Sequence, residues 1–371
     1  MESLNHSKAR GSIKHILIVA ALAAAVAAPA WAAEPPDVVE NARAVDPVAD
    51  TAVDPESVAR ANWRTLMAHN STPGVGCFHS SYPDIVWEKV ACKTGQPRVH
   101  PVHARPRDDE AEVTGGISNG TSNDWVAHAT GLITEAFGFF TTKGITAENG
   151  VSEYNDNGVP LGILGPNEYS IQINTNDLST TSACAGHSGC HVWQQFVYAT
   201  DYLGVGDGAE VFMQYWLINW NATCPAYWNT AYTKTGNDCW TNGILTPAPN
   251  VPITALGNVL LSGSATAGGI DTVSFTYASE AYSNSFFDLV LDISSVWNKA
   301  EFNVVGNGGG SRAVFNFGSS ITVSLYLSDG STSKPTCVVN GGTTGESNNL
   351  DAGPCTAHGG AIPYIRFTEL N

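Results

Sequence analysis

Short segments rich in β-branched and aromatic residues recur along most of the chain, separated by turns of Gly, Asn and Asp. Several segments alternate apolar with polar positions, which is the period of a strand whose two faces meet different surroundings. The pattern predicts strands within residues 125–140, 169–176, 193–200, 211–220, 257–265, 271–278, 286–293, 300–306, 312–318 and 320–328. Because helices do not alternate with these strands, the fold class is predicted to be all-β, an antiparallel sandwich or barrel, and not a parallel α/β fold.

The region before these strands has a different character. Residues 33–58 are rich in Pro, Asp, Ala and Val and contain no aromatic residue, which is typical of a flexible linker or propeptide. Residues 56–70 have the amphipathic pattern of a short helix. We expect residues 59–110 to form a small N-terminal segment closed by a disulfide, and residues 111–371 to form the main β domain.

The first 32 residues have the pattern of a secretory signal peptide. Three basic residues precede an apolar run that ends in the sequence AWA at Ala32. The run is too short to span a membrane comfortably, and its A-x-A ending is typical of a cleavage site. Residues 1–32 are therefore predicted to be removed and the protein to be secreted, either outside the cell or into a periplasm. No later stretch approaches the roughly 18 apolar residues that a transmembrane helix requires.

The chain is acidic. It contains 34 Asp and Glu residues against 17 Lys and Arg residues, a formal net charge of −17 at pH 7. Such a surface repels the phosphates of nucleic acids and the head groups of anionic lipids. We therefore expect no nucleic acid and no membrane among the partners, and we expect a monomer.

Eight cysteines follow the predicted signal peptide, in four close pairs along the chain. In an oxidising compartment an even number of cysteines predicts disulfides, although many pairings are formally possible. Their proximity predicts four local bonds, Cys77–Cys92, Cys184–Cys190, Cys224–Cys239 and Cys337–Cys355. The alternative for the segment CAGHSGCH is a metal site formed by Cys184, His187, Cys190 and His191. The sequence favours this less, because no second cluster of ligands lies nearby.

Polar residues fall on one face of three predicted strands. If the aromatic residues of each strand face the core, alternation places on the other face Gln195 in 193–200, Gln214 in 211–220, and Glu301 and Asn303 in 300–306. Large neighbours, Trp216 and Tyr169, indicate a lined groove and not a face open to solvent. We expect Glu301 and a glutamine of 193–200 to lie on neighbouring strands, with their side chains converging in that groove.

The segments that carry these residues resemble the secreted glutamic peptidases, the eqolisin family. The sequence AEFNVV (300–305) matches the Ala-Glu-aromatic core of a family strand, and FNFGSSITV (315–323) matches the Phe-x-Phe-Gly element that follows it. The order and rough spacing of the other strands agree over about residues 125–328. The resemblance implies an antiparallel double-sheet β-sandwich, concanavalin-like or eqolisin-like, with the small disulfide-closed segment at its N-terminus.

The resemblance also implies the chemistry of a site. The Glu301 carboxylate would activate a water that attacks a peptide carbonyl, and a glutamine amide would stabilise the oxyanion. That glutamine is Gln195 or Gln194, and alternation favours Gln195. The substrate would be a polypeptide, and no metal or other cofactor is required. The groove would be lined by Gln214, Trp216, Tyr169 and Asn303.

The chain departs from the family at two positions. Gln214 stands where the family has a glutamate, and the position of a family aspartate is at best Asn174. Burial of a carboxylate in a partly apolar groove raises its pKa toward the range useful for proton transfer. The resemblance thus implies a secreted, acid-acting glutamic endopeptidase.

Two alternatives compete with a peptidase. A non-catalytic β-sandwich could bind carbohydrate or a cell-surface partner through stacked aromatic side chains, supplied by Trp193, Trp216, Trp220, Trp228 and Trp240. A carbohydrate hydrolase of the same fold would need two facing carboxylates, and Gln214 removes the obvious second acid.

Overall fold

The computed structural model describes residues 54–94, 124–151, 163–176, 179–232, 236–308, 311–339 and 346–371. The chain divides into two compact units, Met1–Asp50 and Thr51–Asn371, and every described residue belongs to the second. The predicted signal peptide and most of the predicted linker lie outside the described residues.

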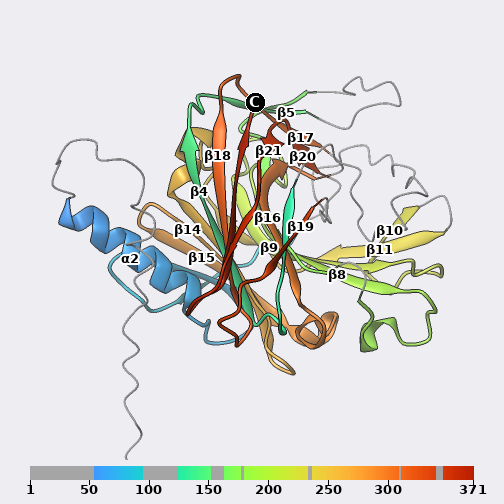
Figure 1. The fold of residues 1–371 in the computed structure, drawn as a ribbon. Coiled ribbons are helices and arrows are strands. Elements are labelled where there is room, and N and C mark those ends of the chain that lie inside the picture. The colour runs from blue at the N-terminus through green and yellow to red at the C-terminus, as the bar shows by residue number, and fades with distance from the viewer. Residues whose placement is uncertain are drawn as a thin grey trace, which may run out of the picture. The chain divides into compact units, whose positions relative to one another are not determined.

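Two large antiparallel sheets form the body of this unit (Figure 1). The first sheet consists, in spatial order, of β2 (Glu88–Val90), β1 (Gly76–Ser81), β15 (Glu280–Phe287), β14 (Ile270–Tyr277), β13 (Val259–Ser264), β4 (Glu135–Lys143), β18 (Ser320–Ser328), β23 (Tyr364–Leu370) and β21 (Asp351–Ala352), with β22 (Thr356–His358) also paired to β23. The second sheet consists of β10 (Asn229–Tyr232), β11 (Asn237–Asn242), β9 (Ala209–Ile218), β8 (His191–Ala199), β7 (Tyr169–Asn174), β16 (Lys299–Gly306), β3 (Trp125–His128) and β19 (Thr336–Val339), with β12 (Thr246–Ala248) paired to β9. A small mixed sheet contains β20 (Ser347–Asn348), β17 (Arg312–Phe315), β5 (Glu148–Val151) and β6 (Ile163–Pro166).

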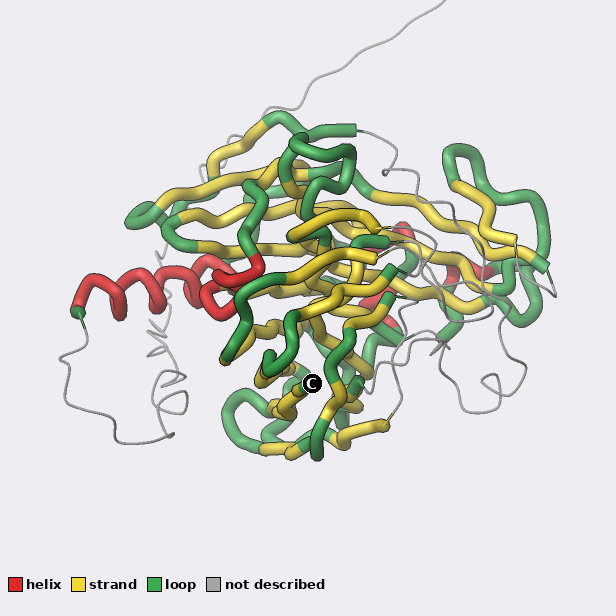
Figure 2. Tube along the Cα trace, turned by 90° about the horizontal axis from the view of Figure 1, so that it is seen from above, coloured by secondary structure: helices red, strands yellow, loops and turns green. Residues whose placement is uncertain are grey.

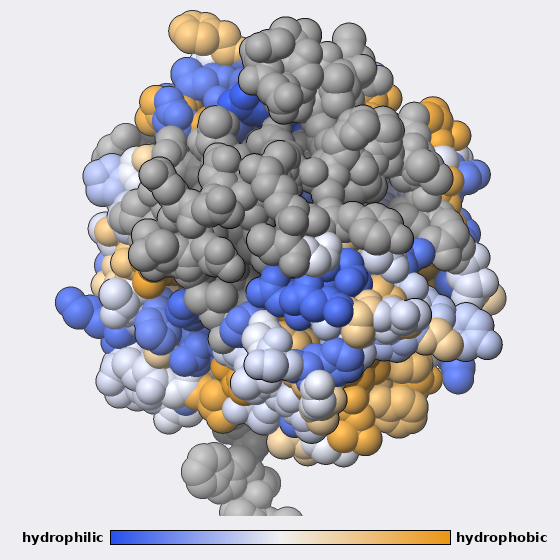
Figure 3. Space-filling model, turned by 90° about the vertical axis from the view of Figure 1, so that its right-hand side faces the viewer, coloured by the Kyte–Doolittle hydropathy of each residue, from blue (hydrophilic) through white to orange (hydrophobic). Residues whose placement is uncertain are grey.

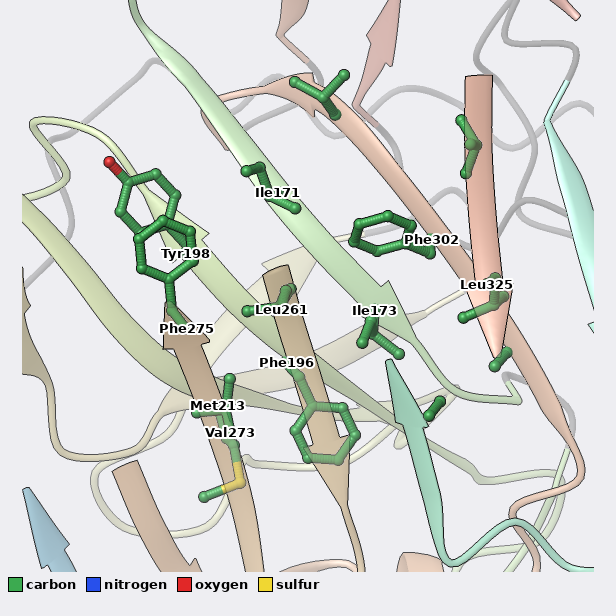
Figure 4. Packing of buried hydrophobic residues seen from close by; sticks show 14 of the residues in the cluster. Ile171, Ile173, Phe196, Tyr198, Met213, Leu261, Val273, Phe275, Phe302 and Leu325 are labelled. Carbon is green, nitrogen blue, oxygen red and sulfur yellow. The ribbon is translucent and has the colours of Figure 1, made fainter. Parts of the chain in front are cut away.

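Apolar side chains from the two large sheets pack against each other, which confirms the predicted all-β sandwich. Tyr198 of the second sheet stacks on Phe275 of the first, with ring centroids 3.9 Å apart. Phe302 of the second sheet stacks on Phe140 of the first at 4.6 Å. Figure 4 shows this interior, in which the labelled side chains of β7, β8 and β16 share one core with those of β13 and β14. The predicted inward faces of residues 193–200 and 300–306 are therefore confirmed.

Two glycines allow the sheets to approach closely. A Cβ on Gly138 of β4 would lie 2.2 Å from the ring of Phe302, and one on Gly263 of β13 would lie 2.4 Å from the ring of Phe196. Both ring positions are in strands of the second sheet that carry polar residues on their other face. The glycines therefore fix how β16 and β8 sit against the first sheet.

Helix α2 (Pro55–His69) confirms the helix predicted at 56–70. Asp54 caps its first turn by accepting from the backbone N–H of Glu56, and Trp63 and Met67 bury its apolar face. The helix runs along one side of the strands (Figure 2). No helix within the described ranges is long and apolar enough to cross a membrane.

The segment after the helix contributes strands to the first sheet. Strand β1 pairs with β2 on one side and with β15 on the other. All four predicted disulfides are present, Cys77–Cys92, Cys184–Cys190, Cys224–Cys239 and Cys337–Cys355. The bond between Cys184 and Cys190 occupies both sulfurs, so the alternative metal site in that segment is wrong.

Two strand predictions differ from the structure. Residues 286–293 form only the end of β15 and then the 3₁₀ turns η3 (Asp288–Val290) and η4 (Ile293–Ser295). The buried Asp288 carboxylate accepts from the backbone N–H groups of Gly268 and Ser294, so the apolar run folds as a turn around it. Residues 125–140 form two strands in different sheets, β3 and β4.

The packing of Gly138 against Phe302 generates a stability prediction. Replacing Gly138 with Ala places a methyl group so close to the ring of Phe302 that the two clash. Overpacking of this kind lowers the free energy of unfolding by about 1–3 kcal/mol. Denaturant unfolding of Gly138→Ala, Phe302→Leu and the double variant measures it. We expect the double variant to be less destabilised than the sum of the single variants, because Leu leaves room for the methyl group. Additive effects would show that the two positions do not compete for space.

Candidate functional site

A row of polar side chains crosses the second sheet at right angles to its strands. The antiparallel register aligns, in order, Glu301 (β16), Asn174 (β7), Gln195 (β8), Gln214 (β9) and Asn242 (β11). These side chains lie on the face opposite the sandwich core, because the residues next to them on β16, β7, β8 and β9 fill that core. The register thus brings one carboxylate and four primary amides into line, an arrangement we call the polar row.

Asn174 lies between the acid and the first glutamine of the polar row. Its Nδ2 donates to Oε2 of Glu301 at 3.2 Å, and its Oδ1 accepts from Nε2 of Gln195 at 3.0 Å. The same Gln195 nitrogen donates to Oε1 of Gln172 at 2.8 Å. The Asn174 amide therefore presents an N–H to the carboxylate and a carbonyl oxygen to the glutamine amide. A peptide bond carries the same two groups.

The other end of the polar row is organised by an indole. The Trp216 N–H lies 3.1 Å from Oε1 of Gln195 and 2.7 Å from Oε1 of Gln214, and so connects the two glutamines. Gln214 Nε2 in turn donates to Oδ1 of Asn242 at 2.8 Å, and Asn242 Nδ2 donates to the Tyr202 hydroxyl at 2.9 Å. Each amide is held as donor and acceptor at once, which fixes its orientation.

Burial decreases along the polar row from the acid outward. Glu301, Asn174 and Gln195 are 1, 2 and 3 % exposed, whereas Gln214 and Asn242 are half-buried. On the side of the molecule toward which β10 and β11 extend, hydrophilic residues gather near the centre with apolar residues beside them (Figure 3). The Glu301 carboxylate is therefore shielded from water, and an electrostatic interaction there is stronger than in water.

A second row of side chains runs beside the polar row. Its members, aligned by register, are Trp193 (β8), Trp216 (β9) and Trp240 (β11). The ring centroids are 5.6 Å apart for the first pair and 5.8 Å for the second. We call these three residues the aromatic row. The other two tryptophans proposed as a platform do not join it, since Trp220 stacks on His187 and Trp228 packs against the core.

Several predicted site residues lie where the sequence placed them, and others do not. Gln214, Trp216 and Asn303 lie on the same face as Glu301 and Gln195. Gln194 points into the sandwich, where its Nε2 donates to Oδ2 of Asp271 at 2.9 Å. Tyr169 is also in the core, and its hydroxyl donates to the carbonyl of Val251. Neither side chain lines a groove with Glu301, because each has the opposite strand parity from the polar row.

The prediction that Glu301 and a glutamine of 193–200 lie on neighbouring strands is wrong. Strand β7 separates β8 from β16, so Glu301 and Gln195 come from strands that are not adjacent. Asn174 supplies the link between them. In the sequence it was recognised only as a position where the chain departs from a family pattern.

A second polar cluster on this face was missed. Asn303 Nδ2 donates to Oδ1 of Asp124 and, at 2.8 Å, to Oε1 of Glu369, while Asn348 Nδ2 donates to the other Glu369 oxygen at 3.1 Å. Burial and the nearby carboxyls of Glu369 and Glu301 hold the pKa of Asp124 well above its ordinary value. Burial raises the pKa of Glu369 to about 7. The position of Asp124 directly before a predicted strand was the available signal.

Metal ligands do not gather in this face. Across the described ranges, no group of three His, Cys, Asp or Glu side chains is arranged to hold a metal ion. The polar row itself consists of a carboxylate and amides, which can transfer a proton and donate hydrogen bonds.

Comparison with known proteins yields distant likenesses. No family model matches the chain, and no curated protein matches it. Among solved structures, scytalido-glutamic peptidase with a transition-state analog inhibitor has a TM-score of 0.31 and 9% sequence identity, covering 66% of this chain and 98% of that one. SCP-B, a member of the eqolisin family in complex with the tripeptide Ala-Ile-His, has a TM-score of 0.27 and 11% identity, covering 66% of this chain and 97% of that one. Likeness of this degree does not place the chain in that family.

Buried carboxyls generate a prediction about pH. Burial raises the pKa of Asp271 and of Glu148 to about 8, and that of Glu369 to about 7. These groups bind protons more tightly in the folded chain than in the unfolded chain, where their pKa is about 4. Their stabilisation is therefore complete below about pH 4 and is lost as the pH rises toward 8, at about 1.4 kcal/mol per unit of pKa difference.

We expect the melting temperature to be highest in acid and to fall steadily between about pH 4 and pH 8. Differential scanning calorimetry across this range measures it. Asp271→Asn should flatten the decline, whereas Glu88→Gln, on an exposed glutamate of β2, should leave it unchanged. A melting temperature that rises from pH 4 to pH 8 would contradict the analysis.

Proposed function

We propose that the protein is a secreted endopeptidase of the glutamic type, which cleaves polypeptides in acid with Glu301 and Gln195. The proposal is carried by the position of Asn174, whose side-chain amide bridges the carboxylate and the glutamine. A substrate peptide bond offers the same N–H and the same carbonyl oxygen. It can therefore take the place of the Asn174 side chain between the two groups.

Glu301 acts as the general base in this scheme. Its carboxylate takes a proton from a water, and the water oxygen forms a bond to the carbonyl carbon of the substrate. The negative charge that develops on the carbonyl oxygen accepts a hydrogen bond from Gln195 Nε2. The protonated Glu301 then gives its proton to the leaving nitrogen as the carbon–nitrogen bond breaks. Strands β8 and β16 are two strand spacings apart, about 10 Å. In this scheme a water and a carbonyl occupy that space after the Asn174 side chain has moved out of it.

Two further features support export and action in acid. The four disulfides agree with an oxidising compartment, as does the predicted signal peptide. Buried carboxyls with raised pKa make the folded chain most stable where they remain protonated. The resemblance of AEFNVV (300–305) to a family strand also supports the choice of Glu301 as the glutamate.

Cleavage of denatured casein tests the proposal. The assay runs at pH 3 to 5 with pepstatin and a metal chelator present. We expect Glu301→Gln to lower the rate by about 10²-fold or more, because the general base is lost. Gln195→Ala should lower it by about 10²–10³-fold, because the oxyanion loses its donor.

The matched control is Glu280→Gln, which removes a strand glutamate of the first sheet and should keep the wild-type rate. Melting curves of all variants show whether they remain folded. Folded Glu301→Gln and Gln195→Ala proteins that cleave at the wild-type rate would refute the assignment.

The aromatic row favours a second candidate, a carbohydrate-binding module without catalytic activity. Sugar rings stack on indoles, and Trp216 and Trp240 are half-buried, whereas Trp193 is buried behind them. The half-buried amides Gln214 and Asn242 supply hydrogen bonds beside them. Saccharide binding that is lost in Trp240→Ala, in a protein that cleaves no casein, would establish this candidate instead. Binding to an immobilised glycan panel measures it.

A further inference from the structure

Asp124 and Glu369 meet on the site face although they come from different sheets. Asp124 precedes β3 of the second sheet, and Glu369 lies in β23 of the first. One nitrogen, Nδ2 of Asn303, donates to both carboxyls. Asn303 is two residues after Glu301 on β16 and therefore has the same strand parity. All four side chains are at most 3 % exposed.

The two carboxyls accept from the same nitrogen, so they lie close together where water is excluded. Two ionised carboxylates held this close repel each other, so one of the two keeps a proton. Glu369 receives hydrogen bonds from Asn303 and Asn348, which stabilise its ionised form. The described residues give Asp124 one such donor, Asn303. Asp124 is thus the protonated acid and Glu369 the carboxylate, and the pair carries one proton and one negative charge.

We propose that Asp124 and Glu369 form a proton-sharing pair of positioning residues, whose single negative charge beside Glu301 sets the pH range in which Glu301 can act as a base. The inference rests on the proposed role of Glu301. Neither residue of the pair touches the substrate in this scheme. The influence is electrostatic and mutual, since Glu301 acts on both members of the pair.

The strands packed around the pair carry several other charged groups. Lys299 lies on the Glu301 face of β16, two residues before Glu301, with His128 opposite it on β3. Arg312 of β17 donates through Nε to the carbonyl of Asn348. On the first sheet, Arg366 of β23 donates to Ser324 and has the opposite parity from Glu369, and Asp351 of β21 is exposed. These groups are unchanged in every variant below.

Two substitutions separate the charge of the pair from its packing. In Asp124→Asn a neutral amide replaces the protonated acid and Glu369 is unchanged, so the negative charge remains. In the double variant Asp124→Asn, Glu369→Gln the pair is neutral at every pH, with nearly the same volume. Glu369→Gln alone is the substitute if the double variant does not fold, because its pair is neutral until Asp124 ionises.

Infrared difference spectra follow the proton on Glu301 without any need for activity. Each protein is compared with the same protein carrying Glu301→Gln, and the protonated carboxyl band is titrated with pH. We expect the double variant to lose the Glu301 proton about one pH unit lower than the wild type, since the like charge is gone. Asp124→Asn should titrate as the wild type does. The acid limb of the casein-cleavage profile should move with the infrared midpoint.

An unchanged midpoint in the double variant overturns the inference, and so does an equal shift in Asp124→Asn, because the charge would then not be the cause. A shift confined to the neutral pair, in a protein that cleaves no casein at any pH, supports the inference about the Glu301 proton. In that case the proposed peptidase function alone would fail.

Discussion

The antiparallel register of the second sheet is the constraint on which the candidate site depends. Glu301, Asn174 and Gln195 are far apart in sequence, and they meet because β16, β7 and β8 pair at one register. A slip of one residue would turn Glu301 into the core and Phe302 out of it. The contact between Phe302 and Phe140, with Gly138 leaving room for the ring, opposes such a slip. Core packing on one face therefore positions the chemistry on the other.

Several parts of the molecule share a second feature, a buried carboxyl group. Asp124 and Glu369 lie beside the site, Asp271 lies in the interior against Gln194, and Glu148 lies in the small sheet. Each position favours the protonated acid, because burial penalises the charge more than the available hydrogen bonds compensate. Stability and the proposed activity consequently share one condition, an acidic medium. An exported protein with this interior would be least stable in neutral surroundings.

The differences between prediction and structure have identifiable causes. An apolar run such as 286–293 satisfies the composition of a strand, yet the Asp288 carboxylate accepts from the backbone N–H groups of Gly268 and Ser294 and so stabilises a turn. Residues 125–140 look like one long strand, but the Asp329 carboxylate accepts from the backbone N–H groups of Thr130 and Gly131 at the break. In both cases a side chain competes with the ladder. Alternation of apolar residues cannot reveal such a competitor, because it comes from outside the run or at its edge.

The sequence by itself determined the fold class, the four disulfide pairs, the helix at 56–70 and the strand faces of Glu301 and Gln195. Each of these follows from local information, namely residue spacing, capping and the two-residue period of a strand. Only the tertiary structure decided that β7 lies between β8 and β16, that Asn174 bridges the acid and the amide, and that Asp124 meets Glu369. Those facts depend on which strands pair and how the two sheets close on each other. Strand order is a property of the whole chain, and no local pattern encodes it.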